Sequence, residues 1–331
     1  MKIGILGATG AVGRQMLECL EERHIEAEEV RLFASARSEG KKIPYNGSEL
    51  TVHEISEAGL QGLDVVLGAV DAPYAEQWAP AIVKAGAVFI DNSKAFRMDP
   101  EVPLVVPEIN GEDALDHPKG IIANPNCSTI ITLMAVAPLH RISPIRTIIA
   151  STYQAVSGAG MKGIEELDQE CKDIAEGKEV HPSAFPAQIA YNCIPWIGSA
   201  SEADYTSEEL KMRNEGRKIL HDPQLKVTCT CVRVPVYRSH SISVSAACEK
   251  PFTVAEAEEA IASFPGDVLM KEGYPMPLMT SDQDLVYVGR IRQDQVFDGG
   301  IALWCCGDQI RKGAAANAVE ILEYLLKQGN L

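Results

Sequence analysis

Residues 2–22 read KIGILGATGAVGRQMLECLEE, a short apolar run followed by a glycine-rich turn and a helix-like segment. The apolar run has the length and the flanks of a buried strand. The order is therefore strand, turn, helix, which is the unit from which parallel α/β sheets are built.

The same alternation continues to about residue 126. Four further apolar runs have the length of strands, and helix-like or loop segments separate them: VRLFAS (30–35), DVVLGAV (64–70), AVFIDNS (87–93) and GIIANPN (120–126). This pattern predicts a parallel sheet with helices on both faces. The predicted fold class is α/β, with a dinucleotide-binding domain of the Rossmann type.

The pattern changes after residue 130. IRTIIASTYQ (145–154) has the character of a strand, and LKVTCTCVRVPV (225–236) and HSISVSAACE (240–249) alternate with period two. We therefore expect an α+β catalytic and dimerisation domain with a mixed sheet over residues 128–310. Residues 178–198 are rich in proline and aromatic residues and show no clear period, so we expect an ordered loop packed on another element or another subunit. The amphipathic segment 311–328 predicts a helix that returns to the first domain, so that domain comprises residues 1–127 and 311–331.

Composition narrows the classes of function. The 331 residues are 46% hydrophobic and 23% charged, as in globular proteins, and the net charge is -16. A chain with this negative net charge is not expected to bind nucleic acid or an anionic membrane. An anionic small-molecule substrate would have to be held by local arginines.

Nothing in the sequence resembles a targeting or membrane segment. The N-terminal residues MKIGILGATG lack a charged region followed by a long apolar stretch, and no window approaches 18 uninterrupted apolar residues. We expect a cytoplasmic protein whose nine cysteines are thiols. The sequence contains no C-x-x-C pair, and no metal is expected.

The glycine-rich turn predicts a dinucleotide site. Gly7, Gly10 and Gly13 lie between strand and helix, where backbone amides and the helix dipole meet a pyrophosphate. An NAD-specific enzyme would carry Asp or Glu about 20 residues further on. This chain instead has SARS at 35–38, in which Arg37 can bind a 2′-phosphate bidentately. The pattern favours NADP, the alternative being that Arg37 is a solvated loop residue.

The stretch NPNCST (124–129) places Cys127 directly ahead of a helix-like apolar run. Unpaired amides at a helix start favour the thiolate form. A single cysteine is more often a small buried hydrophobe. The polar neighbours Asn124, Asn126 and Ser128 favour a nucleophile here.

A nucleophilic cysteine needs a partner that handles protons. His240 stands in YRSHSIS at the start of a predicted strand, and Arg233 and Arg238 precede it. The alternative is an exposed histidine at a strand end. The other six histidines occur in segments typical of a solvated surface, in helix, turn or loop: His24, His53, His117, His140, His181 and His221.

Seven motifs, in order along essentially the whole chain, resemble those of bacterial aspartate-β-semialdehyde dehydrogenases. They are GATGAVG, the SARS loop, NPNCST, TYQAVSGAG (152–160), EELK (208–211), RVPVYRSHS (233–241) and RKGAAANAV. The usual family form of the cofactor loop is SARSAG. Glu39 replaces its alanine here, and we expect that side chain to point outward.

The resemblance implies a role for particular residues. Cys127 would be the nucleophile, His240 the acid/base and Gln154 the residue that orients the thioester or its attacking group. The phosphate site would comprise Arg97, Asn126 and Lys211, and the substrate carboxylate and ammonium would meet Arg233 and Glu208. The implied cofactor contacts are Gly7, Thr9, Gly10, Ala11, Val12, Gly13, Ser35, Arg37, Ser38, Ser157, Gly158 and Asn317. The family also implies a homodimer.

The resemblance implies NADPH-dependent reductive dephosphorylation of L-β-aspartyl phosphate to L-aspartate β-semialdehyde, through a thioester on the cysteine. This reaction serves the biosynthesis of diaminopimelate, lysine, threonine, methionine and isoleucine. The nearest rival is an N-acetyl-γ-glutamyl-phosphate reductase, whose substrate has no ammonium for Glu208 to bind. A rival of another class is a non-catalytic NADP sensor in which Cys127 is structural.

Overall fold

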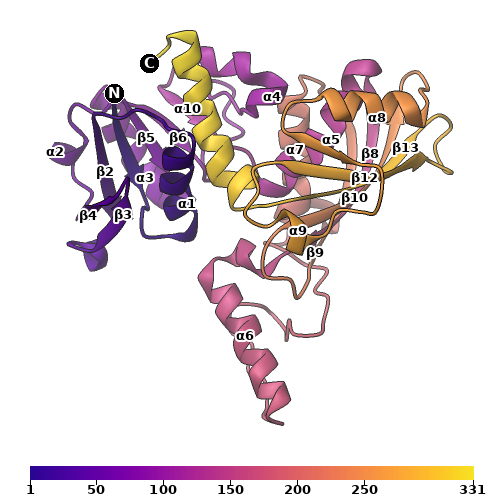
Figure 1. Ribbon diagram of the computed structural model, residues 1–331, viewed down its shortest axis with the longest axis horizontal. Helices are drawn as coiled ribbons and strands as arrows, with labels where there is room; N and C mark the ends of the chain where they lie inside the picture. Colours follow the sequence, from indigo (N-terminus) through magenta and orange to yellow (C-terminus); the bar gives the residue numbers. More distant parts are fainter. The chain divides into compact units, whose positions relative to one another are not determined.

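The computed structural model describes residues 1–331. The chain divides into two compact units, Met1–Asn126 with Ala314–Leu331, and Cys127–Gly313. Figure 1 shows a sheet in each. The predicted fold class, a Rossmann-type domain followed by an α+β domain with a mixed sheet, is confirmed.

The first unit is built on a seven-stranded sheet with the order β3-β4-β2-β1-β5-β6-β7. All neighbouring pairs are parallel except β3 and β4, which form an antiparallel hairpin. The five predicted strands are present, and the hairpin adds two that the apolar runs did not reveal. The bounds are β1 Lys2–Leu6, β2 Glu29–Ala34, β3 Lys42–Tyr45, β4 Ser48–Glu54, β5 Val65–Gly68, β6 Val88–Asp91 and β7 Ile121–Ala123.

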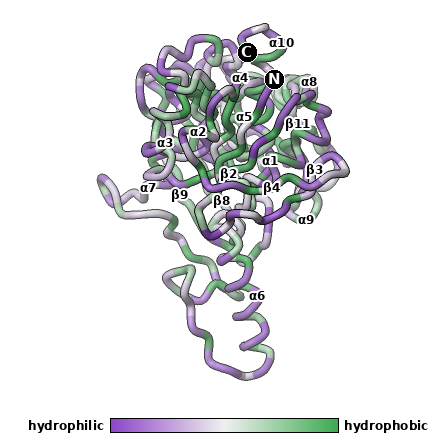
Figure 2. Tube along the Cα trace, turned by 90° about the vertical axis from the view of Figure 1, so that its left-hand side faces the viewer, coloured by the Kyte–Doolittle hydropathy of each residue, from purple (hydrophilic) through white to green (hydrophobic).

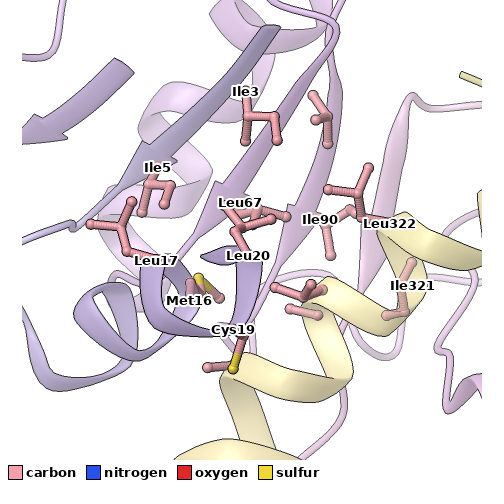
Figure 3. Close-up of a cluster of buried hydrophobic side chains, with 14 of the residues drawn as sticks. Ile3, Ile5, Met16, Leu17, Cys19, Leu20, Leu67, Ile90, Ile321 and Leu322 are labelled. Carbon is pink, nitrogen blue, oxygen red and sulfur yellow. The ribbon is translucent and has the colours of Figure 1, made fainter. Parts of the chain in front are cut away.

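Helices cover this sheet, and the last of them comes from the C-terminal end of the chain. The helix predicted over 311–328 is α-helical from Ala316, after a π-helical turn at Arg311–Ala315. It packs beside α1 in one apolar core with β1, β5 and β6 (Figure 3). The helices are α1 Ala11–Glu22, α2 Glu57–Leu60, α3 Ala72–Lys84, α4 Pro107–Asn110 and α10 Ala316–Gln328.

The second unit contains a six-stranded mixed sheet with the order β11-β12-β13-β10-β8-β9. The pairs β8–β9 and β11–β12 are parallel and the other pairs are antiparallel. The three strands predicted here are all found. The bounds are β8 Ile145–Gln154, β9 Lys226–Arg233, β10 His240–Cys248, β11 Asp267–Met270, β12 Val286–Gln293 and β13 Ile301–Gly307.

One helix, α5 (Cys127–Ile142), forms the centre of this unit. Its residues 128–139 are all buried, because it packs against the sheet and also against α7 and α8. A helix that is apolar on every side requires such an enclosed position. The remaining helices are α6 Met161–Ala175, α7 Ser207–Ile219, α8 Val254–Ser263 and α9 Pro277–Thr280.

Residues 178–198 contain neither a helix nor a strand, as predicted. They pack on α6 of the same chain, where Leu167 of α6 forms a small apolar core with Phe185, Ile189 and Ile194. Hydrophobic and hydrophilic residues are mixed along α6 (Figure 2), as expected for a helix with one buried face. No helix in the structure has the length and apolar character needed to cross a membrane.

Candidate active site

Cys127 and His240 lie together in the second unit. Cys127 is the first residue of α5 and is half-buried, and His240 is the fully buried first residue of β10. The Sγ of Cys127 lies 3.5 Å from Nε2 of His240. A thiol and an imidazole 113 positions apart in the chain are therefore in contact.

The surroundings of His240 define its protonation. The backbone N–H of Ala155 donates to Nδ1 at 3.1 Å, so Nδ1 acts as an acceptor and a neutral ring carries its proton on Nε2. Burial lowers the pKa of His240 to about 3, and the positive charge of Arg233 adds to this shift. The ring is therefore neutral at physiological pH and presents an N–H to the sulfur of Cys127.

Gln154, the last residue of β8, connects this pair to a carboxylate. Its Nε2 lies 3.4 Å from Nε2 of His240 and donates to Oε1 of Glu208 at 3.3 Å. The hydroxyl of Thr152 donates to Oε1 of Gln154 at 3.0 Å. Because both ends of the amide are engaged, its orientation is defined.

Glu208 and Lys211 form an ion pair on the first turn of α7, with 2.7 Å between Nζ and Oε2. The two residues are three positions apart, so they lie on one face of the helix. Glu208 is buried, whereas Lys211 is partly exposed. The predicted ammonium-binding carboxylate thus already has a cation beside it.

Arg233 ends β9 and is buried next to the same group of residues. Its Nη1 donates to the carbonyl of Ala155 at 2.5 Å, and its guanidinium lies 5.8 Å from the centre of the Phe185 ring. Burial lowers the pKa of Arg233, and the charge of Glu208 opposes that effect. The Ala155 peptide thus contacts His240 through its N–H and Arg233 through its carbonyl.

Two glycines allow this close packing. A Cβ on Gly158 would lie 2.7 Å from Nη1 of Arg233, and a Cβ on Gly313 would lie 2.7 Å from Cβ of Cys127. Ser157 is buried beside Gly158 and accepts a hydrogen bond from Nε2 of Gln309. Gln309 also accepts from the backbone N–H of Ser239, next to His240, and sequence reasoning did not single it out.

The glycine-rich turn belongs to the first unit. Gly7 has a φ of +87°, and a Cβ there would lie 2.3 Å from the carbonyl oxygen of Ala69. A Cβ on Gly13 would lie 2.3 Å from the Gly7 oxygen, so this glycine allows the helix to approach the strand. A Cβ on Gly10 would meet only the Gly7 carbonyl oxygen, at 3.4 Å, and no side chain caps α1. The first amides of α1, from Ala11 onward, are left for an anion.

The SARS loop follows β2 and turns through a short 3₁₀ segment at Ala36–Ser38. Arg37 is exposed and Ser38 is buried. Nζ of Lys41 lies 3.4 Å from Oγ of Ser38, which adds a second cation to the loop. Sequence reasoning missed Lys41, although it stands only three positions after the motif.

Glu39 is exposed, as expected, but its carboxylate is not free. It accepts a hydrogen bond from the backbone N–H of Glu54 and lies 3.1 Å from Nδ1 of His53. The loop is thereby attached to β4. His53 lies on that strand, rather than in a helix, turn or loop, and His140 is half-buried, which lowers its pKa. The prediction of solvated surface histidines was wrong for His140.

Two predicted phosphate ligands and one predicted nicotinamide contact also lie in the first unit. Arg97 is buried and donates to the carbonyls of Asn124 and Asn92, each at 2.9 Å. Asn126, the last residue of the first segment of this unit, is buried. Nδ2 of Asn317 donates to Asn124 at 2.7 Å, whereas its buried Oδ1 has no hydrogen-bond partner.

Two family models match the chain. The model described as "Semialdehyde dehydrogenase, NAD binding domain" matches residues 2–117, and the one described as "Semialdehyde dehydrogenase, dimerisation domain" matches residues 136–312. Together with the two-unit fold, these matches define the class of protein as an oxidoreductase of the semialdehyde dehydrogenase type.

Individual relatives narrow the class further. An aspartate-semialdehyde dehydrogenase of Aquifex aeolicus is 49% identical, over 99% of this chain and 98% of the relative. One from Synechocystis is 47% identical over the same shares. A crystal structure of aspartate semialdehyde dehydrogenase II from Vibrio cholerae, complexed with ASA, superposes with a TM-score of 0.97 at 40% identity, covering 98% of each chain. The chain belongs to the aspartate-semialdehyde dehydrogenase family, which confirms the resemblance seen in its motifs.

Proposed function

We propose that the chain catalyses the NADPH-dependent conversion of L-β-aspartyl phosphate to L-aspartate β-semialdehyde and phosphate, and the reverse reaction. The observation that supports this most directly is the 3.5 Å contact between Cys127 and the neutral, buried His240, in a chain of this family. The product would supply the biosynthesis of lysine, threonine, methionine and isoleucine.

Cys127 is the proposed nucleophile. Its thiolate attacks the acyl carbon, phosphate leaves, and a thioester forms on the sulfur. The resemblance implied that His240 is the acid/base. Because its neutral ring accepts from Ala155 at Nδ1, we propose instead that its Nε2–H stabilises the thiolate and then donates a hydrogen bond to the oxygen atom that becomes negative in each tetrahedral intermediate. Gln154 orients the thioester or its attacking group, because the amide of Gln154 is itself held by Thr152 and Glu208.

The two ends of the substrate would meet different charges. Arg233 binds the α-carboxylate and Glu208 the ammonium, while Arg97, Asn126 and Lys211 bind the phosphate. Since Lys211 already contacts Glu208, a substrate ammonium must compete with it for the carboxylate. Displacement would leave the Lys211 ammonium available to the phosphate.

The first unit fits NADP. The uncapped start of α1 and the absence of a side chain at Gly10 suit a pyrophosphate, with contacts from Gly7, Thr9 and the residues 10–13. Ser35, Arg37, Ser38 and Lys41 suit a 2′-phosphate. The unpaired Oδ1 of Asn317 can accept a hydrogen bond from a carboxamide. Bound NADPH supplies the hydride that reduces the thioester. We further propose a cytoplasmic homodimer, and Ser157 and Gly158 as nicotinamide contacts.

The test is phosphate-dependent reduction of NADP with L-aspartate β-semialdehyde. Wild-type protein should turn over only when phosphate is present, and Cys127→Ala should abolish turnover while retaining NADP binding, because the glycine loop is elsewhere. Retention of activity within tenfold by Cys127→Ala would refute the mechanism. A wild type that prefers N-acetylglutamate semialdehyde would refute the substrate.

A further inference from the structure

Two buried carboxylates of α6 hold the loop that contacts Arg233. We propose that Glu166 and Glu170 are positioning residues, which fix residues 183–194 as the wall beside Arg233 and so determine how the substrate carboxylate binds. This inference rests on the proposed function, because it assigns Arg233 to the substrate.

Glu166 receives four hydrogen bonds from the start of the loop. Its Oε2 accepts from the backbone N–H and the hydroxyl of Ser183, at 2.8 and 2.7 Å, and from the N–H of Ala184. Its Oε1 accepts from the N–H of Phe185 at 3.1 Å. Burial alone raises the pKa of Glu166, but these bonds outweigh it and lower the pKa below its usual range. The carboxylate is therefore ionised and bound to the backbone of the loop.

Glu170, one helical turn further along, holds the next part of the loop. Its Oε2 accepts from the backbone N–H groups of Ile189 and Ala190, at 2.8 and 2.7 Å. Neither glutamate forms an ion pair, and both are buried. Burying an ionised carboxylate without a cation is costly unless several donors satisfy it. The loop backbone satisfies both oxygens of Glu166 and Oε2 of Glu170, whereas Oε1 of Glu170 is buried without a hydrogen-bond partner.

The same loop contacts Arg233 in two places. Phe185 lies under its guanidinium, and Ile194 exchanges two backbone hydrogen bonds with it, at 2.8 and 2.9 Å. A cavity of about 350 Å³ opens here, and its lining includes Phe185, Trp196 and Arg233. Displacing residues 183–190 would move Phe185 and change the space in which a substrate carboxylate meets Arg233.

Glu165 provides a matched control. It is the neighbour of Glu166 on α6, but its side chain is exposed and forms no hydrogen bond or ion pair with the loop. Glu165→Gln changes the charge of the same helix by the same amount. Any effect peculiar to Glu166→Gln or Glu170→Gln therefore comes from the hydrogen bonds to the loop.

The experiment combines amide hydrogen exchange with steady-state kinetics on the full-length protein. Relative to Glu165→Gln, Glu166→Gln should speed exchange over residues 183–185 at least tenfold, and Glu170→Gln should do so at Ile189 and Ala190, because each change removes bonds to a charged acceptor. Both should raise the KM for aspartate semialdehyde roughly tenfold. The KM values for phosphate and NADP should stay as in the control. The kcat should stay within about threefold of the control value.

Three results would overturn the inference. They are exchange no faster than in Glu165→Gln, faster exchange with an unchanged semialdehyde KM, and a parallel fall in melting temperature and kcat with no selective change in KM. The last result would show that the glutamates only stabilise the fold. A wild type inactive with aspartate semialdehyde would instead refute the proposed function, and the positioning role with it.

Discussion

The backbone N–H of Ala155 points at Nδ1 of His240, 3.1 Å away, while the other ring nitrogen lies 3.5 Å from the sulfur of Cys127. A main-chain donor cannot change its protonation, so it holds the ring in one tautomer. An imidazolium would place a second N–H against the N–H of Ala155. The geometry and the lowered pKa of His240 thus agree that this histidine works as a neutral donor.

We predict that His240 is neutral and protonated on Nε2 between pH 5 and 8. Nitrogen-15 NMR of histidine-labelled protein should show one ring with Nδ1 unprotonated and no titration near pH 6.5, and that signal should be missing from His240→Gln. A ring that is protonated on Nδ1, or that titrates near 6.5, would contradict this assignment.

The same shift predicts a pH dependence of stability. The pKa is about 3 in the folded chain and near 6.5 when unfolded, so the unfolded state binds the proton more tightly. The contribution of neutral His240 to the free energy of unfolding is present above pH 6.5 and is lost as the pH falls toward 3. Between pH 7 and 5 the loss is about 2 kcal/mol. Removing the ring should make the protein less sensitive to acid. Melting curves of wild type and His240→Gln at both pH values test this, and an equal loss of stability in both would exclude it.

Cys127 should be the cysteine that controls inactivation by alkylation. Burial raises the pKa of Cys305, Cys306 and, to about 11, of Cys248, so these thiols should react slowly. Iodoacetamide should abolish activity as one thiol is labelled at Cys127. The exposed Cys193 is the expected competitor. Cys193→Ser should be inactivated at the wild-type rate, and inactivation that follows labelling of another cysteine would disprove the assignment.

Five strands of the first sheet were predictable, though not their order in it, because buried parallel strands appear as continuous apolar runs between turn signals. The hairpin of β3 and β4 was missed, although its turn is Asn46-Gly47, a common hairpin signal. β3 is short, and both strands carry exposed polar residues, so they lack such a run.

The site was predictable only in part. Cys127, His240 and the glycine turn carry sequence patterns tied to local structure, namely a helix start, a strand start and a strand–helix turn. No local pattern reveals that Ala155 sets the tautomer of His240, since this depends on where β8 ends relative to β10. The hydrogen bonds from residues 183–190 to α6 likewise need the tertiary fold.

The cofactor loop should distinguish NADP from NAD through Arg37 and Lys41. Arg37→Ala and Lys41→Met should each raise the KM for NADP roughly ten- to hundredfold and leave that for NAD within about threefold, because only NADP carries the 2′-phosphate. Lys42→Met is the control, since Lys42 contacts Glu49 on β4 instead. Equal losses with both cofactors would show that these residues maintain the fold of the loop.

Glu208 and Glu209 are neighbours on α7 with different partners. Substitutions at the two residues therefore test substrate recognition and helix stability separately. Glu209 forms a capping box with Thr206 and accepts from the backbone N–H of Cys231. Glu208 contacts Gln154 and Lys211. We expect Glu209→Gln to lower the melting temperature and leave the KM for aspartate semialdehyde nearly unchanged.

Glu208→Gln should show the opposite pattern. It keeps the size of the side chain but removes the charge that would bind the substrate ammonium, so use of aspartate semialdehyde should weaken by about 1.5 to 3 kcal/mol. The same change releases Lys211 from its ion pair, so the KM for phosphate should not rise. An N-acetylated substrate has no ammonium, and its kinetics should not respond to Glu208→Gln. Steady-state kinetics with both aldehydes measure these effects. If semialdehyde kinetics are unchanged in Glu208→Gln, or if phosphate binding weakens instead, Glu208 supports Lys211 and does not bind the ammonium.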